Sequence, residues 1–412
     1  MTSPLRIGFV GGGFITRFHI QSLVEVRDVE VAGVTSLTRA SAEDAAALAR
    51  ELEVGPAARA YDSVEELAAD AAVDAIWICA RNDTRVTTMR AIALGAKRRS
   101  KDRPLRGICI EKPLARTLGE ALEVAEIAKD SGAPTGDLED MLWAPALVRG
   151  KEVLWRRGAA SSGRPYLARA AEEHAGPHSK WFWEPAIAGG GALLDMMCHS
   201  IEAARWLLTE PGAPRASLTP LEVSATIANL KWTQPKYAAD LAARFPGVDW
   251  AKRHSEDFAR ATVVWRDEAG RTLLTETTSS WCYVGAGLRH TFALLGPEYS
   301  LDVDMADTGV RVFFSRNVTG AAGEDLVEKQ NAEQGLMPIS PNEPAHYGYA
   351  GENRHFARAF ARGTRPDLTV HDGVEVMRIL MAAYQSAAEH RSVDPNTVSH
   401  TTGGFLPREC RT

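Results

Sequence analysis

The sequence predicts an α/β protein in which an N-terminal domain with a parallel sheet precedes a C-terminal α/β domain with a large, mainly antiparallel sheet. Two observations carry this prediction. Strand-like and helix-like segments alternate through roughly the first 140 residues, as in a parallel sheet with helices on both faces. Later strand-like runs follow one another with only turn residues between them, which is typical of an antiparallel sheet. We therefore expect domains at residues 1–140 and 141–412.

Each element of the first domain is an apolar run bounded by turn residues. The predicted strands are residues 5–10, 29–34, 74–79 and 107–110, and the predicted helices are 14–26, 41–53, 63–69, 84–94 and 115–128. Residues 97–106 contain six basic residues in ten. We expect a solvated surface loop there, with an anion-binding segment as the alternative.

The second domain is read in the same way. The predicted helices are residues 144–155 and 193–208, with two more near 350–362 and 372–389. The predicted strands are a run from Tyr166 and residues 221–230, 258–265, 272–280, 290–295 and 310–315. Residues 231–256 are polar and contain two prolines, so we expect an insertion over the sheet.

Composition excludes several classes of protein. The 412 residues are 45% hydrophobic and 24% charged, as in an ordinary globular protein, and the net charge of −6 gives no global basis for binding nucleic acid or an anionic membrane. The five cysteines form no C-x-x-C pair, so we expect free thiols in a reducing cytoplasm. No uncharged apolar stretch approaches about 20 residues, so no membrane span is expected.

A glycine-rich loop follows the first predicted strand. Gly11 and Gly13 stand in the frame G-x-G-x-x-T, which differs from the dinucleotide fingerprint by Thr16 in place of a small third residue. The helix that begins at Phe14 and Ile15 would hold a pyrophosphate at its N-terminus. The alternative is a purely structural turn.

The end of the second predicted strand bears on the choice of cofactor. No acidic residue lies between Val31 and Ala42, where an acid would bind the ribose of NAD. Ser36 and Arg39 occur there instead, and a guanidinium can pair with a 2′-phosphate. The sequence therefore favours NADP over NAD, unless Arg39 is only an exposed residue at a helix start.

Two further groups suit proton transfer. Lys112 follows Glu111 at the end of a predicted parallel strand, where side chains reach a cofactor crevice. Asp195 and His199 are four residues apart and would share one face of a helix, just after Gly189–Gly191. A surface lysine and a structural Asp–His pair are the alternatives.

These stretches together resemble the glucose–fructose oxidoreductase, inositol dehydrogenase and MocA (Gfo/Idh/MocA) family. The similar segments are residues 8–19, 110–115, 189–199, 352–356 and 372–393. The resemblance implies a Rossmann domain followed by an α/β domain whose large open-faced sheet often also serves oligomerisation, so we expect a dimer or tetramer. It also implies that Lys112, Asp195 and His199 are catalytic, in reversible hydride transfer between nicotinamide and a secondary alcohol of a sugar, inositol or related polyol.

The resemblance extends to the cofactor and substrate pockets. Asn82 matches a cofactor-binding position, whereas Arg81 and Arg85 replace the usual proline and histidine and, with Arg39, would form a local basic cluster. Glu139, His174, His178 and Trp183 are the candidate substrate-binding residues, with core packing as the alternative for Trp183. We expect no metal, because Gly176 and Pro177 break any helix between the two histidines.

Three functions remain open on the sequence alone. The first is an NAD(P)-dependent dehydrogenase acting on a sugar or polyol. The second is a glycoside-cleaving enzyme that retains NAD for transient oxidation. The third is a non-catalytic regulator that senses a dinucleotide or sugar, although the joint presence of Lys112, Asp195 and His199 argues against it.

Overall fold

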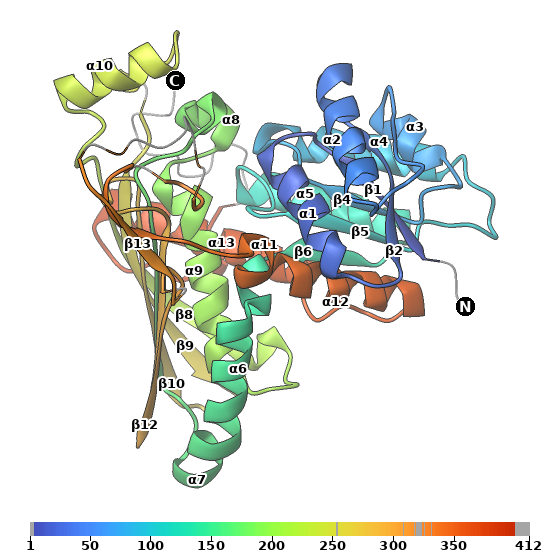
Figure 1. Ribbon diagram of the computed structural model, residues 1–412. Coiled ribbons are helices and arrows are strands. Elements are labelled where there is room, and N and C mark those ends of the chain that lie inside the picture. Colours follow the sequence, from blue (N-terminus) through green and yellow to red (C-terminus); the bar gives the residue numbers. More distant parts are fainter. Residues whose placement is uncertain are drawn as a thin grey trace. The chain divides into compact units, whose positions relative to one another are not determined.

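The chain divides into two compact units. The computed structural model describes residues 4–399 apart from residues 253, 308, 317, 319–323, 325 and 331, so Cys410 lies outside the described residues. The first unit comprises Met1–Pro145 and Tyr347–Glu375, and the second comprises Ala146–His346 and Val376–Thr412 (Figure 1). The first break lies close to the predicted boundary at residue 140, but the return of Tyr347–Glu375 to the first unit has no counterpart in the sequence prediction. Among the described helices, none has the length and apolar character needed to cross a membrane.

The first unit contains a six-stranded parallel sheet in the order β3-β2-β1-β4-β5-β6. Its strands are β1 (Leu5–Val10), β2 (Val29–Thr35), β3 (Arg59–Ala60), β4 (Ala75–Ile78), β5 (Gly107–Glu111) and β6 (Thr135–Leu138). This is the strand order of a Rossmann fold, which places a topological switch point between β1 and β4. The predicted fold class is confirmed. The predicted strands omit β3, which has two residues, and β6, whose sequence Thr-Gly-Asp-Leu is not an apolar run.

Helices connect these strands, and their ends follow local chemistry. They are α1 (Phe14–Ser22), α2 (Arg39–Glu51), α3 (Val64–Ala69), α4 (Arg85–Ala96), α5 (Leu118–Ser131) and α12 (Tyr349–Arg362). The hydroxyls of Thr38, Ser63 and Thr117 each accept a backbone N–H in the first turn of α2, α3 and α5. At α3 the Glu66 carboxylate also accepts the backbone N–H of Asp62 at 3.1 Å, one residue before the Ser63 cap.

Helix α12 packs on the first sheet through two phenylalanines. A Cβ atom on Gly107 of β5 would lie 2.3 Å from the ring of Phe360, and one on Gly136 of β6 would lie 2.3 Å from the ring of Phe356. The two glycines therefore leave the space that the two rings fill. This packing fixes a C-terminal helix to a sheet that is formed by the first part of the chain.

The second unit contains a six-stranded mixed sheet in the order β12-β11-β7-β10-β9-β8. Its strands are β7 (Leu167–Glu173), β8 (Leu218–Ala228), β9 (Phe258–Asp267), β10 (Thr272–Ser280), β11 (Arg289–Gly296) and β12 (Tyr299–Asp304). Only β7 and β10 pair in parallel, so the sheet is mainly antiparallel as predicted. A separate two-stranded sheet joins β13 (Arg311–Phe314) to β14 (Gly335–Pro338).

Helix α9 (Ala192–Leu208) packs against one face of this mixed sheet. The other helices of the unit are α6 (Pro145–Val153), α7 (Ala160–Ser162), α8 (Pro185–Ala188), α10 (Pro235–Arg244), α11 (Glu343–His346) and α13 (Val370–Glu389), which starts in the first unit. Buried and exposed residues alternate along β7 and β9, as expected for a sheet with one face in the core.

The segment 231–256 differs from the predicted polar insertion. It contains α10, and its Trp232, Leu241, Val248 and Trp250 are buried in a hydrophobic cluster with Trp183, Trp281, Ala192 and Met196. The cluster reaches α9 through Ala192 and Met196. The segment therefore contributes to the core of the second unit through its large apolar side chains.

Candidate active site

The glycine loop joins the end of β1 to the start of α1. Gly11 has a φ of +113°, and a Cβ atom there would lie 2.6 Å from the backbone oxygen of Cys79, so this position requires glycine. A Cβ atom on Gly13 would meet no protein atom within 4 Å, which leaves room for a ligand. Thr16 is fully buried, and its hydroxyl donates to the backbone oxygen of Gly11 at 2.9 Å. The unusual third residue is therefore accommodated by a hydrogen bond within the loop.

Phe14 and Ile15 form the first turn of α1. The N-cap residue is Gly13, which has no side chain to accept the N–H groups of that turn. Phe14 is 37% exposed and its ring stacks on that of Phe18 at 5.4 Å. The N–H groups of this first turn can therefore bind the pyrophosphate of a dinucleotide, the role predicted for the glycine loop.

Ser36 and Arg39 follow β2, as the sequence predicts for a cofactor ribose. Ser36 is half-buried, and Arg39 is exposed at the start of α2. The Arg39 guanidinium forms an ion pair with the carboxylate of Asp62, which precedes α3. Both side chains of the pair are largely exposed, at 59% and 77%. A 2′-phosphate would therefore have to compete with Asp62 for this guanidinium.

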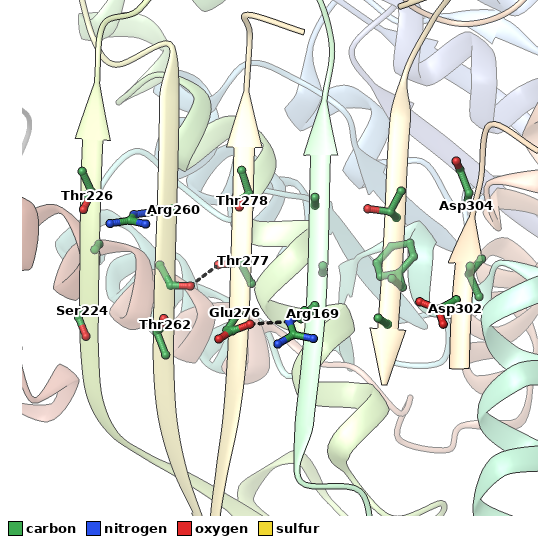
Figure 2. Close-up of a pocket in the computed structure, with 18 of the residues that line it drawn as sticks. Arg169, Ser224, Thr226, Arg260, Thr262, Glu276, Thr277, Thr278, Asp302 and Asp304 are labelled. Atoms are coloured by element: carbon green, nitrogen blue, oxygen red, sulfur yellow. Dashed lines mark hydrogen bonds and ion pairs between the residues drawn. The ribbon is translucent and has the colours of Figure 1, made fainter. Parts of the chain in front are cut away.

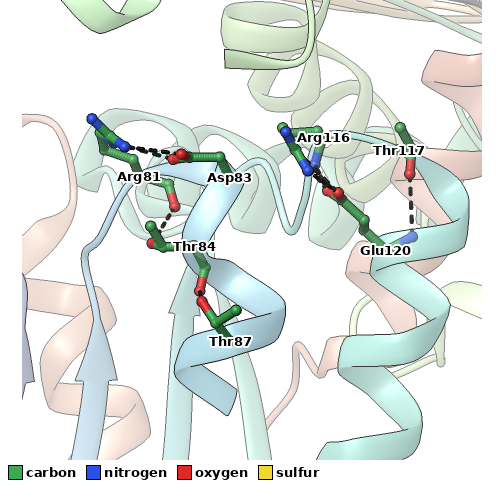
Figure 3. A network of polar contacts seen from close by, with 7 residues as sticks. All are labelled: Arg81, Asp83, Thr84, Thr87, Arg116, Thr117 and Glu120. Atoms are coloured by element: carbon green, nitrogen blue, oxygen red, sulfur yellow. Dashed lines mark hydrogen bonds and ion pairs between the residues drawn. The ribbon is translucent and has the colours of Figure 1, made fainter. Parts of the chain in front are cut away.

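The other two arginines of the predicted basic cluster are committed to protein contacts. The Arg81 guanidinium donates to Asp83 at 3.1 and 2.9 Å, beside a second pair formed by Arg116 and Glu120 (Figure 3). Arg85 is 2% exposed and donates to the backbone oxygen of Ile78 at 2.7 Å. The predicted cluster is therefore wrong for Arg85, whose charge lies inside the domain, and Arg81 is already neutralised by Asp83.

Asn82 and Glu111 lie at the ends of β4 and β5. Asn82 is 4% exposed and begins the short turn before α4. Glu111 is 5% exposed and accepts a hydrogen bond at 2.8 Å from Nε2 of His19 on α1. Burial opposes ionisation of Glu111, but the contact with His19 and nearby charges outweigh it and lower its pKa. Glu111 therefore links the last residues of β5 to the helix that starts at the glycine loop.

Lys112 comes directly after Glu111, at the carboxyl end of β5, and is half-buried. His19, which holds Glu111, is itself held by Asn353 of α12 at 3.3 Å through its Nδ1. Asn353 also accepts the indole N–H of Trp77 at 2.8 Å. This buried chain of hydrogen bonds fixes the backbone that carries Lys112.

Asp195 and His199 lie on α9 in the second unit, as predicted. Asp195 is half-buried in the first turn of the helix and His199 is 4% exposed. The ring of His199 meets that of His290 edge to face, with centroids 6.0 Å apart. The predicted helix is therefore confirmed, and the spacing of four residues places both side chains on one side of it.

His290 is a polar residue of this region that the sequence prediction does not single out. It is completely buried on β11, and its Nε2 lies 3.9 Å from a carboxylate oxygen of Glu172 on β7. His290, Phe292 and Leu294 alternate on the buried face of β11. That alternation was visible in the sequence, and a histidine among core positions of a strand is the signal that could have found it.

The four predicted substrate residues have different surroundings. Glu139 follows β6 in the first unit and is 2% exposed. His174 follows β7, is also buried, and its Nδ1 accepts the backbone N–H of Gly176 at 2.9 Å. Trp183 is 1% exposed, packs edge to face on Trp232 and Trp250, and donates its indole N–H to Pro177. Trp183 therefore belongs to the core, so the core-packing alternative holds for this candidate substrate residue.

His178 differs from His174 because it lies beside cations. Its Nδ1 is 2.7 Å from Nζ of Lys329. Burial, together with the charges of Lys329 and Arg244, lowers the pKa of His178 to about 3. His178 is therefore neutral at physiological pH and accepts from the Lys329 ammonium.

Two domain models of one protein family match the chain. The oxidoreductase family model with an NAD-binding Rossmann fold matches residues 5–135, and the C-terminal alpha/beta domain model of the same oxidoreductase family matches residues 166–394. The two matches correspond to the two sheets described above.

Curated relatives carry names of sugar and polyol enzymes. The chain is 30% identical to 1,5-anhydro-D-fructose reductase of Ensifer adhaerens over 52% of its own length and 60% of that protein. It is 28% identical to inositol 2-dehydrogenase of Paracoccus denitrificans over 50% of its own length and 55% of that protein. These matches thus span little more than half of each relative. D-xylose 1-dehydrogenase (NADP(+)) 2 of Haloferax volcanii matches over 95% of this chain and 99% of its own, at 24% identity.

Solved structures share the fold. GenD2 from gentamicin A biosynthesis, in complex with NAD, superposes with a TM-score of 0.73 at 24% identity and covers 96% of this chain and 97% of its own. Levoglucosan dehydrogenase, in complex with NADH and L-sorbose, gives a TM-score of 0.67 at 21% identity over 95% of this chain and 99% of its own. At these identities the likeness concerns the fold.

Proposed function

We propose that this chain, which belongs to the Gfo/Idh/MocA oxidoreductase family, is an NAD(P)-dependent dehydrogenase or reductase acting on a secondary alcohol of a sugar, inositol or glycoside. The observation that carries the proposal is the glycine loop, where Gly11 makes the turn and the space beside Gly13 is open at the N-terminus of α1. The names of the curated relatives support the substrate class.

The proposed roles are those that the family resemblance implies for the matching residues of this chain. The nicotinamide supplies the hydride chemistry when it is bound. Gly11, Gly13, Phe14 and Ile15 would hold the pyrophosphate, while Ser36, Arg39, Asn82 and Glu111 line the rest of the proposed dinucleotide site. His199, assisted by Lys112, would remove or return the hydroxyl proton of the substrate, and Asp195 would orient that hydroxyl. Glu139, His174 and His178 are the proposed substrate-binding residues.

The proposed cofactor is NADP in preference to NAD. The absence of an acid between Val31 and Ala42 and the position of Arg39 at the start of α2 support this choice. The ion pair between Arg39 and Asp62 weakens the preference, because the 2′-phosphate must displace an existing partner. We therefore expect activity with both cofactors and a modest preference for NADP.

We also propose that the chain forms a homo-oligomer through the open face of the mixed sheet. Side chains of β7 to β12 line a broad hollow on this face (Figure 2). Arg169 and Arg260 lie on the same face as Glu276, Asp302 and Asp304, so it carries both signs of charge. A face with both signs can pair with a second copy of itself about a two-fold axis.

The proposed compartment is the cytoplasm. The four cysteines within the described residues, Cys79, Cys109, Cys198 and Cys282, are free thiols. Burial raises the pKa of the Cys79 and Cys109 thiols, which suits structural rather than reactive roles.

The proposed activity is tested by following nicotinamide absorbance with a panel of sugars, inositols and glycosides and with both cofactors. We expect turnover with net reduction or oxidation of the nicotinamide. Cleavage of a glycoside without net reduction would identify the glycoside-cleaving alternative instead. Cofactor binding without turnover across the whole panel would identify a sensor and reject the proposed enzyme.

A further inference from the structure

The backbone N–H groups at the start of α9 are hydrogen-bonded to one residue that is far away in the sequence. The N-cap of α9 is Gly191, which has no side chain to accept the first amides of the helix. Glu256 replaces that function: its Oε1 accepts the backbone N–H of Gly191 at 3.0 Å and of Leu193 at 2.8 Å. Its backbone oxygen accepts the N–H of Ala192 at 2.9 Å. Three consecutive amides at the start of α9 therefore bind to Glu256.

The glycines before α9 leave the space that this contact needs. A Cβ atom on Gly191 would lie 2.0 Å from the backbone oxygen of Glu256, and one on Gly190 would lie 2.1 Å from the hydroxyl oxygen of Tyr384. That hydroxyl donates to Oε1 of Glu256 at 2.9 Å. The glycine run thus lets the loop approach Glu256 and α13, which is a function separate from the approach of a ligand.

The segment that delivers Glu256 is fastened at both ends. The carboxylate of the next residue, Asp257, accepts the backbone N–H groups of Leu230, Lys231 and Trp232 at 2.7 to 2.9 Å. Between these points Trp232, Leu241, Val248 and Trp250 pack into the cluster that contacts Ala192 and Met196 of α9. The segment therefore ends at the first turn of α9, where Glu256 binds the helix amides.

Burial of the Glu256 carboxyl group costs free energy, because the charged form loses its contact with water. The residue is 1% exposed, and burial raises its pKa to about 7 in spite of the hydrogen bonds that it accepts. An apolar side chain of similar size would fill the space without that cost but would accept no hydrogen bond, so the acceptor atom is the feature that the contact uses.

We propose that Glu256 is a positioning residue that sets the orientation of the first turns of α9, and through them the side chains of Asp195 and His199. The proposal rests on the proposed dehydrogenase function for its kinetic consequence. Its structural part, that Glu256 fixes the start of α9, stands independently. Asp195 lies in the first turn, and its backbone N–H bonds to the backbone oxygen of Gly191, the residue that Glu256 holds. A loosened start of α9 would therefore displace Asp195 first.

The test compares Glu256→Ala, Glu256→Gln and Tyr384→Phe with Glu268→Ala, a control in the exposed turn between β9 and β10. Hydrogen exchange of peptides covering residues 190–197 reports on the helix start, and kcat and KM are measured with the best substrate of the panel. In Glu256→Ala we expect faster exchange at 190–197 and a loss of kcat of roughly 100-fold, as misplacement by about 1 Å can cause, with KM for the dinucleotide unchanged.

The other variants separate positioning from general stability. Glu256→Gln keeps the carbonyl acceptor and should restore protection and most of kcat. Tyr384→Phe should have a smaller effect than Glu256→Ala because the three amide contacts of Glu256 remain. Wild-type exchange and kcat in Glu256→Ala would overturn the proposal, as would faster exchange throughout the second unit in both Glu256 variants. If the wild-type protein turns over no substrate, the proposed function fails and the exchange data alone decide the role of Glu256.

Discussion

At the scale of single residues, the site depends on side chains whose partners fix their charge and direction. Glu111 is held by His19, His178 is kept neutral beside Lys329, and Arg85 is buried against the backbone of Ile78. Such contacts show which polar side chains already have a protein partner that a ligand would have to replace.

Lys112 is the first residue to test. Lys112→Ala and His199→Ala should each abolish turnover, because each removes a group proposed to handle the hydroxyl proton. Both variants should still bind the dinucleotide, since the glycine loop is unaltered, and cofactor fluorescence measures that binding. Lys129→Ala, in the exposed last turn of α5, is the matched control. Near-normal turnover in either catalytic variant would reject the proposed mechanism.

Arg39 and Asp62 together test the cofactor preference. Arg39→Ala should lower kcat/KM for NADP by roughly ten-fold, the equivalent of one exposed charge-assisted contact of about 1.4 kcal/mol, and should leave NAD nearly unchanged. Asp62→Asn should raise kcat/KM for NADP, because the guanidinium is freed from its ion pair. Equal effects of Arg39→Ala on the two cofactors would show that Arg39 does not bind the 2′-phosphate.

At the scale of elements, α9 has contacts on several sides in the second unit. Its first turn bonds to Glu256, and Met196 packs in the hydrophobic cluster that contains Trp183. Near its end, the backbone oxygen of Trp206 accepts a hydrogen bond from Nζ of Lys151 on α6 at 2.5 Å. The helix that carries Asp195 and His199 is therefore fixed at both ends.

Lys151 gives a prediction about pH. Burial, with a smaller contribution from the charge of Arg215, lowers the pKa of Lys151 to about 6 from the usual 10.5. Between these values the unfolded chain binds a proton that the folded chain does not, so the free energy of unfolding should rise with pH by up to about 1.4 kcal/mol per unit. The Lys151→Met variant should lack this component of the slope.

Urea unfolding at several pH values between 7 and 9 measures the Lys151 effect as the difference between the variant and the wild type. The free energy of unfolding of Lys151→Met, compared with that of the wild type, should be highest at the lower end of this pH range. Lys129→Met, at an exposed position, should give a difference that does not change with pH. A constant difference for Lys151→Met would mean that Lys151 keeps its ordinary pKa in the folded protein.

At the scale of the whole molecule, the mixed sheet presents a broad polar face to its surroundings (Figure 2). Thr262 lies on β9 within this face. If a second copy covers it, Thr262→Arg should place a large charged side chain in a buried interface and convert the oligomer to monomer. Sedimentation velocity measures the mass, with Glu268→Ala as the control. An unchanged oligomer in Thr262→Arg would exclude this face as the interface.

The sequence by itself determined the features that depend on neighbouring residues. The alternation of strands and helices, the glycine loop after β1, the Ser63 cap and the helical spacing of Asp195 and His199 all rest on contacts within a few residues. Such contacts leave a periodic or compositional pattern, which is why the fold class, the family resemblance and the candidate catalytic residues could be predicted.

Only the tertiary structure decided which distant partners these residues have. Glu256 reaches Leu193 across 63 positions, Asp62 reaches Arg39 across 23, and Tyr347–Glu375 returns to the first unit after the whole mixed sheet. For Trp183, the tertiary structure decided between the two interpretations that the sequence left open, substrate binding and core packing, in favour of the core. A polar or aromatic side chain looks alike in the sequence whether it faces a ligand or another segment, because the packing of distant segments determines its surroundings.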